Sequence, residues 1–320
     1  MKAIFQTGYG SPDYFELREV ERPGIRENRV LVRVRAAALH AGDIWFMRGT
    51  PYMVRFSAGF PRPRNYTPGY DLAGEVEAVG KGVTQFKPGD EVFGAHQKTI
   101  AEYALVPADR LVHRPATLSL EQAAAVPTSA LAALHGLRDA GKVQAGQKVL
   151  INGASGGVGT YAVQIAKALG AEVTGVCSGA KADMVRSIGA DEVIDYAKTN
   201  FTKGEKRYDL ILDQAASHSL SEYRRVLTPR GVHIPNSGNS GLGYVINAFI
   251  QSIFLRQQGR PYLSVPNNED LVLLKEMVES GKVKPVIDRI YSMNDISGAF
   301  RYLDEGLARG KVVVAMESNY

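Results

Sequence analysis

Apolar and polar residues alternate along short segments in the first third of the chain. Residues 30–35 read Val-Leu-Val-Arg-Val-Arg, and residues 74–79 read Gly-Glu-Val-Glu-Ala-Val. A period of two is typical of a β-strand with one face in water. The turn Lys87-Pro88-Gly89-Asp90 leads into a further apolar segment at 91–93. Because glycine and proline interrupt the pattern so often, we predict a β-rich first domain with little helix.

The pattern changes near Ser119, where apolar strands begin to alternate with amphipathic helices. We predict strands at 148–151, 172–177, 192–195, 209–213 and 231–234, and helices at 158–169 and 181–188. This alternation indicates βαβ units, and therefore an α/β fold with a doubly wound parallel sheet. The segment 285–316 returns to strand, helix and strand, with Asp295 as the predicted N-terminal cap of its helix. Periodicity alone leaves open whether this segment packs on the first domain.

Composition narrows the function classes. The 320 residues are 45% hydrophobic and 22% charged, which suits two globular domains. The net charge of +5 does not indicate nucleic-acid binding, because the basic residues are scattered and the densest cluster is Arg62-Pro63-Arg64. The longest apolar run, 242–255, is too short for a membrane span. The first ten residues contain no signal region, and a single cysteine, Cys177, cannot form an intrachain disulfide, so we expect a cytoplasmic protein.

A glycine-rich loop follows one predicted strand and opens a predicted helix. It reads Gly153-Ala154-Ser155-Gly156-Gly157-Val158-Gly159. Glycine lets the chain turn tightly and lets a pyrophosphate approach the backbone amides, and the positive end of the helix dipole favours the bound anion. The alternative is a structural turn without a ligand. Because the βαβ unit continues for the expected length, we predict that these seven residues bind a dinucleotide.

The end of the second predicted strand indicates which dinucleotide binds. Sites that prefer NAD place an Asp or Glu there to bond the ribose 2′-hydroxyl. This chain has Val-Cys-Ser-Gly-Ala-Lys at 176–181, without a carboxylate. Ser178 can donate to a 2′-phosphate and Lys181 can neutralise it. The alternative is that Lys181 is a solvated residue that opens a helix. We predict NADPH as the cofactor.

Several segments together resemble the medium-chain dehydrogenase/reductase superfamily. The similarity is to its zinc-independent quinone-oxidoreductase branch, including bacterial relatives of the mitochondrial reticulon-interacting reductase. The matching segments are the glycine loop and residues 39–43, 68–74, 86–92, 188–196 and 310–313. The resemblance implies a GroES-like catalytic domain made of residues 1–121 and 284–320, a Rossmann domain at 122–283, and a homodimer.

The resemblance also implies roles for single residues. NADPH-using relatives hold the 2′-phosphate with a serine, a lysine and a tyrosine, which match Ser178, Lys181 and Tyr196. The stretch Asn236-Ser237-Gly238 is similar to the loop that passes the nicotinamide, so Asn236 and Ser237 are expected at the cofactor. Lys311 lies in the cofactor-proximal motif of the family's tail.

The chain departs from the zinc-dependent members of this superfamily. Where those enzymes place metal ligands, this sequence has His40 in the first motif and Tyr70-Asp71 in the second. Cys177 is the only cysteine, so a four-cysteine zinc site is impossible. A catalytic zinc needs three protein ligands, and His40 and Asp71 supply two at most. We predict that no metal takes part.

Chemistry without a metal limits the substrates. Quinones and α,β-unsaturated carbonyls delocalise the incoming electron pair, so the developing oxyanion needs only a hydrogen-bond donor or a water. Tyr52 lies in a segment that resembles a pocket of quinone-reducing relatives, and His40 stands at a metal-ligand position. The alternatives are an ordinary half-buried tyrosine and a structural histidine. We expect Asp43 to orient the preceding loop and Cys177 to pack near the cofactor.

These observations predict an oxidoreductase that transfers a hydride from NADPH to a quinone or an α,β-unsaturated carbonyl. The alternatives are reduction of an enoyl thioester or an aldehyde, and a non-catalytic NADPH-binding sensor or partner protein. The apolar run 242–255 has three interpretations: a core helix, a subunit interface, or a wall of an apolar substrate pocket. The third assigns Tyr244, Phe249 and Phe254 to that pocket.

Overall fold

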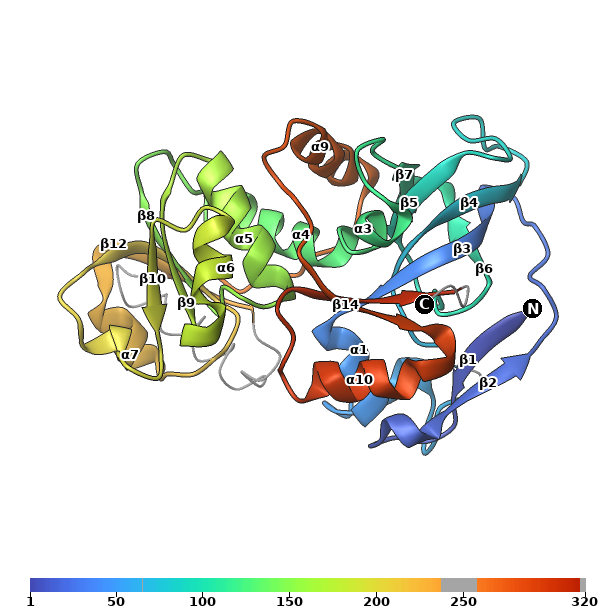
Figure 1. Ribbon diagram of the computed structural model, residues 1–320, viewed down its shortest axis with the longest axis horizontal. Helices are drawn as coiled ribbons and strands as arrows, with labels where there is room; N and C mark the ends of the chain where they lie inside the picture. The colour runs from blue at the N-terminus through green and yellow to red at the C-terminus, as the bar shows by residue number, and fades with distance from the viewer. Residues whose placement is uncertain (65, 237–257, 317–320) are drawn as a thin grey trace. The chain divides into compact units, whose positions relative to one another are not determined.

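The chain forms two compact units in the computed structural model, which describes residues 1–64, 66–236 and 258–316 (Figure 1). The first unit contains Met1–Thr128, Pro266–Ser280 and Pro285–Tyr320, and the second contains Ser129–Val265 and Gly281–Lys284. The resemblance implied a Rossmann domain at 122–283. The structure differs chiefly at 266–280, which it assigns to the first unit.

A mainly antiparallel sheet of seven strands forms the centre of the first unit. Its order is β14-β15-β3-β4-β5-β7, and β6 pairs with β3. The strands are β3 Arg29–Leu39, β4 Asp71–Val79, β5 Glu91–Ala95, β6 Tyr103–Pro107, β7 Leu111–His113, β14 Ile287–Ser292 and β15 Lys311–Ala315. Two further strands, β1 Lys2–Gln6 and β2 Phe15–Glu19, form a separate antiparallel pair. Because β15 pairs antiparallel with β3, the late segment packs on the first unit.

The central strand β3 shows why these residues form a sheet. Val32 and Val34 are buried, whereas Arg33 between them is exposed, as expected for a strand with one wet face. The second half, Ala36–Leu39, is buried on both faces. Its short alanine side chains let β4 and β15 approach on either side.

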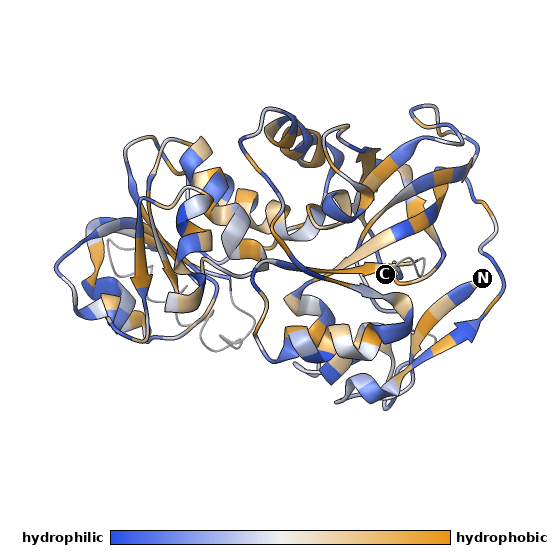
Figure 2. Ribbon diagram, viewed as in Figure 1, coloured by the Kyte–Doolittle hydropathy of each residue, from blue (hydrophilic) through white to orange (hydrophobic). Residues whose placement is uncertain are grey.

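The first unit also contains helices. They are α1 Ala41–Arg48, α2 Val54–Ala58, α3 Leu120–Ala124, α9 Asn268–Glu279 and α10 Ile296–Asp304. The prediction of little helix in this region was wrong for α1 and α2. The strand–helix–strand order of the tail is confirmed, and Asp295 caps α10 by accepting from Gly298 N at 3.2 Å. Hydrophobic and hydrophilic residues alternate along α10, and Phe300 on its apolar side is fully buried (Figure 2).

Six parallel strands form the sheet of the second unit. They are β8 Lys148–Asn152, β9 Glu172–Cys177, β10 Glu192–Asp195, β11 Tyr208–Asp213, β12 Leu227–Pro235 and β13 Gln258–Gly259. Their order is β10-β9-β8-β11-β12-β13, which is the 3-2-1-4-5-6 order of a Rossmann fold. The predicted fold class is therefore confirmed.

Helices cover both faces of this parallel sheet. They are α5 Gly157–Ala168, α6 Ala182–Ser187 and α7 Leu220–Arg225, and α4 Pro127–Leu134 and the π-helical turn His135–Ala140 precede β8. A Cβ on Gly175 would lie 2.7 Å from Val185 of α6, whereas the next residue, Val176, belongs to the hydrophobic cluster with Tyr223 of α7. Because successive side chains of a strand point to opposite faces, α6 and α7 cover opposite faces (Figure 1).

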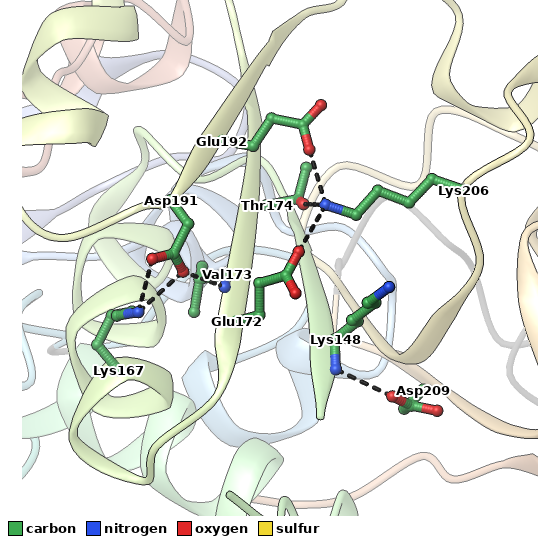
Figure 3. Close-up of polar contacts among 9 residues, drawn as sticks. All are labelled: Lys148, Lys167, Glu172, Val173, Thr174, Asp191, Glu192, Lys206 and Asp209. Atoms are coloured by element: carbon green, nitrogen blue, oxygen red, sulfur yellow. Dashed lines mark hydrogen bonds and ion pairs between the residues drawn. The ribbon is translucent and has the colours of Figure 1, made fainter. Parts of the chain in front are cut away.

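Ion pairs bind the strands together at the amino edge of the parallel sheet (Figure 3). The ammonium group of Lys206 lies 2.9 Å from Glu172 at the start of β9 and 2.7 Å from Glu192 at the start of β10. Partial burial alone would lower the pKa of Lys206, but its hydrogen bonds to both carboxylates outweigh this and raise the pKa. These contacts join the starts of β9 and β10.

The apolar run 242–255, with Tyr244, Phe249 and Phe254, lies outside the described residues. Within the ranges that are described, no helix combines the length and the hydropathy that a membrane crossing requires.

Candidate cofactor and active site

The glycine-rich loop connects β8 to α5 at the carboxyl edge of the parallel sheet. Gly153 has a φ of 86°, in the left-handed region that favours glycine. The backbone N–H groups of Gly153 and Ala154 donate to Val176 O of β9 at 3.1 and 2.9 Å. A Cβ on Gly159 would clash with the carbonyl oxygen of Gly153. Gly153, Ala154 and Gly159 therefore form a tight turn that leaves no room for larger side chains.

The start of α5 has amide groups that can receive an anion. Side-chain oxygens of Ser119, Ser219 and Asn267 cap the helices α3, α7 and α9. In contrast, the N-cap of α5 is Gly156, which supplies no such oxygen. A Cβ on Gly156 would meet only Gly153 O, at 3.5 Å, so the space before these amides is open. The turn and the first helical residues contain all seven residues predicted to bind the dinucleotide, and their geometry fits a pyrophosphate.

A side-chain donor without a partner lies beside this turn. Gln214 follows β11, and its Cβ lies 3.2 Å from the position that a Cβ on Gly153 would take. Its Oε1 accepts from Asn236 Nδ2 at 3.0 Å, but its buried Nε2 has no hydrogen-bond partner among the described residues. A buried donor of this kind needs an acceptor, so a polar ligand fits this edge. Of the predicted pair, Asn236 lies here, and Ser237 lies outside the described residues.

The residues predicted to hold the 2′-phosphate lie at the ends of two adjacent strands. Ser178 directly follows β9, and Lys181 N donates to Ser178 O at 2.9 Å, which closes a short turn. Tyr196 follows β10, and its backbone N–H donates to Cys177 O at 3.2 Å. The ring of Tyr196 is exposed, whereas Ser178 and Lys181 are half-buried. The structure therefore brings the three residues to one corner of the sheet.

A carboxylate reaches the same corner from the neighbouring strand. Asp195 ends β10, and a Cβ on Gly179 would lie 2.5 Å from Asp195 Oδ2. The sequence analysis did not assign Asp195 to this site. It ends the strand β10, whose parallel pairing with β9 places Asp195 opposite Cys177. Burial, and secondarily the charge of Asp195, raises the pKa of the Cys177 thiol. A protonated, buried thiol agrees with packing rather than with a nucleophile.

A buried ion pair occupies the second family motif in the first unit. Asp71 Oδ2 lies 3.2 Å from Lys311 Nζ, and both side chains are almost completely buried. Asp71 Oδ1 accepts from Thr128 N at 2.9 Å and from the Thr128 hydroxyl. Sequence reasoning missed Thr128. The pairing gives the ammonium group of Lys311 a partner within the protein, and its predicted contact with the cofactor remains a prediction.

His40 occupies the first family motif, at the start of α1. Its backbone N–H donates to Asp43 Oδ2 at 2.9 Å, and its Nδ1 lies 3.6 Å from the same oxygen. The expectation that Asp43 orients this loop is thus confirmed. Burial raises the pKa of Asp43, and His40 opposes that shift. His40 Nε2 is buried and has no hydrogen-bond partner in the described part of the chain.

The second predicted donor, Tyr52, lies in a different setting. It is 69% exposed, so the alternative of a half-buried tyrosine was wrong. The guanidinium group of Arg55 lies 4.7 Å from its ring centroid and 4.5 Å from that of Tyr9. Arg55 Nε also donates to Gly49 O at 2.9 Å. Arg55 therefore stacks on the ring of Tyr52, and no hydrogen bond or ring contact joins Tyr52 to His40 among the described residues.

The donor set for a metal is small. Residues 1–64, 66–236 and 258–316 contain no group of three or more His, Cys, Asp or Glu side chains that could hold a metal ion. Of the two residues at metal-ligand positions, Asp71 already binds Lys311 and Thr128. A metal at Asp71 would have to compete with that ammonium group.

Two family models match the chain. Residues 26–116 match the alcohol dehydrogenase GroES-like domain, and residues 188–314 match the zinc-binding dehydrogenase family. The 2-methylene-furan-3-one reductase of Solanum lycopersicum is 34% identical over 98% of this chain and 79% of its own length. The mitochondrial NAD(P)H oxidoreductase RTN4IP1 of Bos taurus is 33% identical over 90% of this chain and 81% of its own length.

A solved structure extends the agreement to the fold. The quinone oxidoreductase from Coxiella burnetii superimposes with a TM-score of 0.88 at 27% identity, and the match covers 99% of each chain. Similarity of this extent, in sequence and in fold, shows that the chain belongs to the medium-chain dehydrogenase/reductase superfamily of oxidoreductases.

Proposed function

We propose that this chain transfers a hydride from NADPH to a quinone or an α,β-unsaturated carbonyl. The observation that carries the proposal is the glycine turn with open helical amides, beside a strand end that offers Ser178 and Lys181. The names of its relatives, a 2-methylene-furan-3-one reductase, an NAD(P)H oxidoreductase and a quinone oxidoreductase, support it. In this proposal the second unit holds the cofactor.

Each part of the cofactor has candidate partners. The amides of residues 153–159 would receive the pyrophosphate. Ser178, Lys181 and Tyr196 would hold the 2′-phosphate, and Asn236 and Ser237 would border the nicotinamide. When bound, NADPH supplies a hydride at C4 of that ring. The chain's own task is to orient the substrate against this atom and to exclude water.

His40 is the proposed donor to the substrate oxygen. Its Nε2 is buried and has no hydrogen-bond partner among the described residues, and its Nδ1 lies 3.6 Å from Asp43 Oδ2, beyond hydrogen-bond distance, so the tautomer with its proton on Nε2 can form. A hydrogen bond from Nε2 would stabilise the negative charge that develops on a quinone or enone oxygen during hydride addition. Because the conjugated π-system shares that charge, one such donor is sufficient and no Lewis acid is required. Tyr52 is a second candidate donor, and Asp43 is a positioning residue.

The finer parts of the proposal concern substrate, assembly and location. We propose an apolar substrate, a homodimer and a cytoplasmic location, without nucleic-acid binding. The single buried cysteine supports a reducing compartment, and the scattered basic residues argue against nucleic acid. Light scattering of the purified protein on a size-exclusion column tests the dimer.

A substrate panel tests the reaction. The purified protein is mixed with NADPH and a quinone, an enone, an enoyl thioester or an aldehyde, and the loss of NADPH absorbance is followed. We expect turnover with the quinone and the enone. Turnover of only the enoyl thioester or the aldehyde would show that the substrate is one of these instead of a quinone or an enone. NADPH binding without turnover of any compound would favour a non-catalytic binding protein.

A further inference from the structure

The first unit contains a cavity that none of the predicted site residues lines. Its volume is about 740 Å³, within the range of small-molecule sites. The walls come from β1, from residues 18–29, which run from the end of β2 to the start of β3, from residues 96–98 and from β6. The cavity is therefore formed by chain segments other than those that carry His40, Tyr52, Asp71 and Lys311.

Cationic side chains dominate the charge of this cavity. Arg26, Arg29 and Lys98 line it and have no ion pair or side-chain hydrogen bond with any described residue. A fourth cation, Arg18, is paired with Glu16 at 2.7 Å. Glu21 is the one carboxylate among the lining residues. Three unpaired cations near one carboxylate leave a net positive site.

Lys98 and the nearby His96 both bring hydrogen-bond donors to this cavity. Lys98 has a φ of 69°, a left-handed conformation that is uncommon for lysine. Its backbone N–H donates to Gly69 O at 3.1 Å, which holds this conformation. Burial and the nearby charge of Arg29 lower the pKa of His96 to about 4, so its ring is neutral near pH 7. A neutral imidazole can donate a hydrogen bond to an anion without adding charge.

Apolar side chains form the rest of the cavity wall. Ala3 and Ala101 are buried, and Phe5, Val20 and Leu105 are half-buried. We propose that this cavity binds a small amphipathic anion, with its phosphate or carboxylate at Arg26, Arg29 and Lys98 and its apolar group against this wall. None of its lining residues is among those proposed to bind NADPH or substrate.

Octyl phosphate is a suitable probe, because it carries both parts of the proposed ligand and cannot accept a hydride. Calorimetric titration into the NADPH-saturated protein is expected to show binding of octyl phosphate. Octanol and inorganic phosphate, which each carry one part, are expected to bind at least tenfold more weakly. If inorganic phosphate binds as well as octyl phosphate, or if octyl phosphate does not bind, the proposal is wrong. Competition between octyl phosphate and NADPH would place the probe at the cofactor site and also overturn it.

Two variants locate the binding site. Lys98→Gly removes a cation and suits the left-handed backbone, so the fold is expected to remain intact. Lys142→Gly is the matched control, because Lys142 is also exposed with a positive φ, of 52°, but lies outside the cavity. We expect Lys98→Gly and Arg29→Gln each to weaken octyl phosphate binding about fivefold or more, and Lys142→Gly to leave it unchanged. If wild type and both cavity variants bind octyl phosphate with equal affinity, the assignment is wrong. Unaltered melting temperatures of the variants would show that any loss of binding does not come from loss of folding.

Discussion

At the scale of single residues, two opposite charges lie at one corner of the parallel sheet, where Asp195 approaches the turn that carries Lys181 through Gly179. In our proposal Lys181 favours a 2′-phosphate and Asp195 opposes it. We expect NADPH to bind at least tenfold more tightly than NADH, which corresponds to about 1.4 kcal/mol. Lys181→Ala should narrow this gap by weakening NADPH, and Asp195→Asn should widen it. Fluorescence titration of the three proteins with both cofactors measures six dissociation constants, and equal affinities in the wild type would refute NADPH preference.

His40 permits a second test at the residue scale. If its Nε2 donates to the substrate oxygen, His40→Ala should lower kcat about 100- to 1000-fold, the usual effect of losing such a donor. The KM for NADPH should stay the same, because His40 is not among the cofactor residues. His40→Gln keeps an N–H donor and should recover part of the activity. A His40→Ala enzyme with unchanged kcat would leave Tyr52, or a water, as the donor.

His96 predicts how stability changes with pH. Its pKa is lowered to about 4 in the folded chain, against about 6.5 for an unfolded histidine. Between these values the unfolded chain binds a proton that the folded chain does not, so stability falls as the pH decreases from about 6.5 to 4. We expect the melting temperature of His96→Gln to fall less steeply over this window than that of the wild type. Parallel curves for the two proteins would contradict the prediction.

At the scale of elements, Lys206 joins the starts of β9 and β10 through Glu172 and Glu192. Lys206→Met leaves the two carboxylates without their shared cation, and partly exposed pairs of this kind contribute roughly 1 kcal/mol each at most. We expect the melting temperature to fall by about 2–4 °C, with unchanged NADPH affinity, because the cluster lies at the amino edge of the sheet. Lys203→Met, at an exposed lysine without a partner among the described residues, is the control. An equal change in both variants would show that the ion pairs contribute nothing.

The elements also show what the sequence could predict. β9 and β10 have the bounds expected from hydropathy, because each is a short apolar segment between turns. Helices α1 and α2 were missed, since the N-cap of α1 is His40, which is not a usual capping residue. In the candidate site, the glycine turn is local and could be predicted. The contacts of Asp71 with Thr128 and Lys311 could not, because they join positions 57 and 240 residues apart.

At the scale of the whole molecule, the donor set predicts a reaction that needs no metal. Activity is expected to survive prolonged treatment with a chelator, and elemental analysis should find far less than one zinc per chain. The reason is that Asp71 already binds Lys311, and His40 alone cannot hold a catalytic zinc. Stoichiometric zinc, together with loss of activity on its removal and recovery on its return, would contradict this mechanism.

The pairing of β15 with β3 has a consequence for protein synthesis. Residues 36–39 of β3 leave the ribosome long before their partner strand at Lys311–Ala315 has been translated. At about 5–20 residues per second, the delay is roughly 14 to 54 seconds. During that time an apolar strand edge stays open to other chains. We therefore expect the nascent protein to depend on chaperones until its last strand emerges, even though its Rossmann sheet can form earlier.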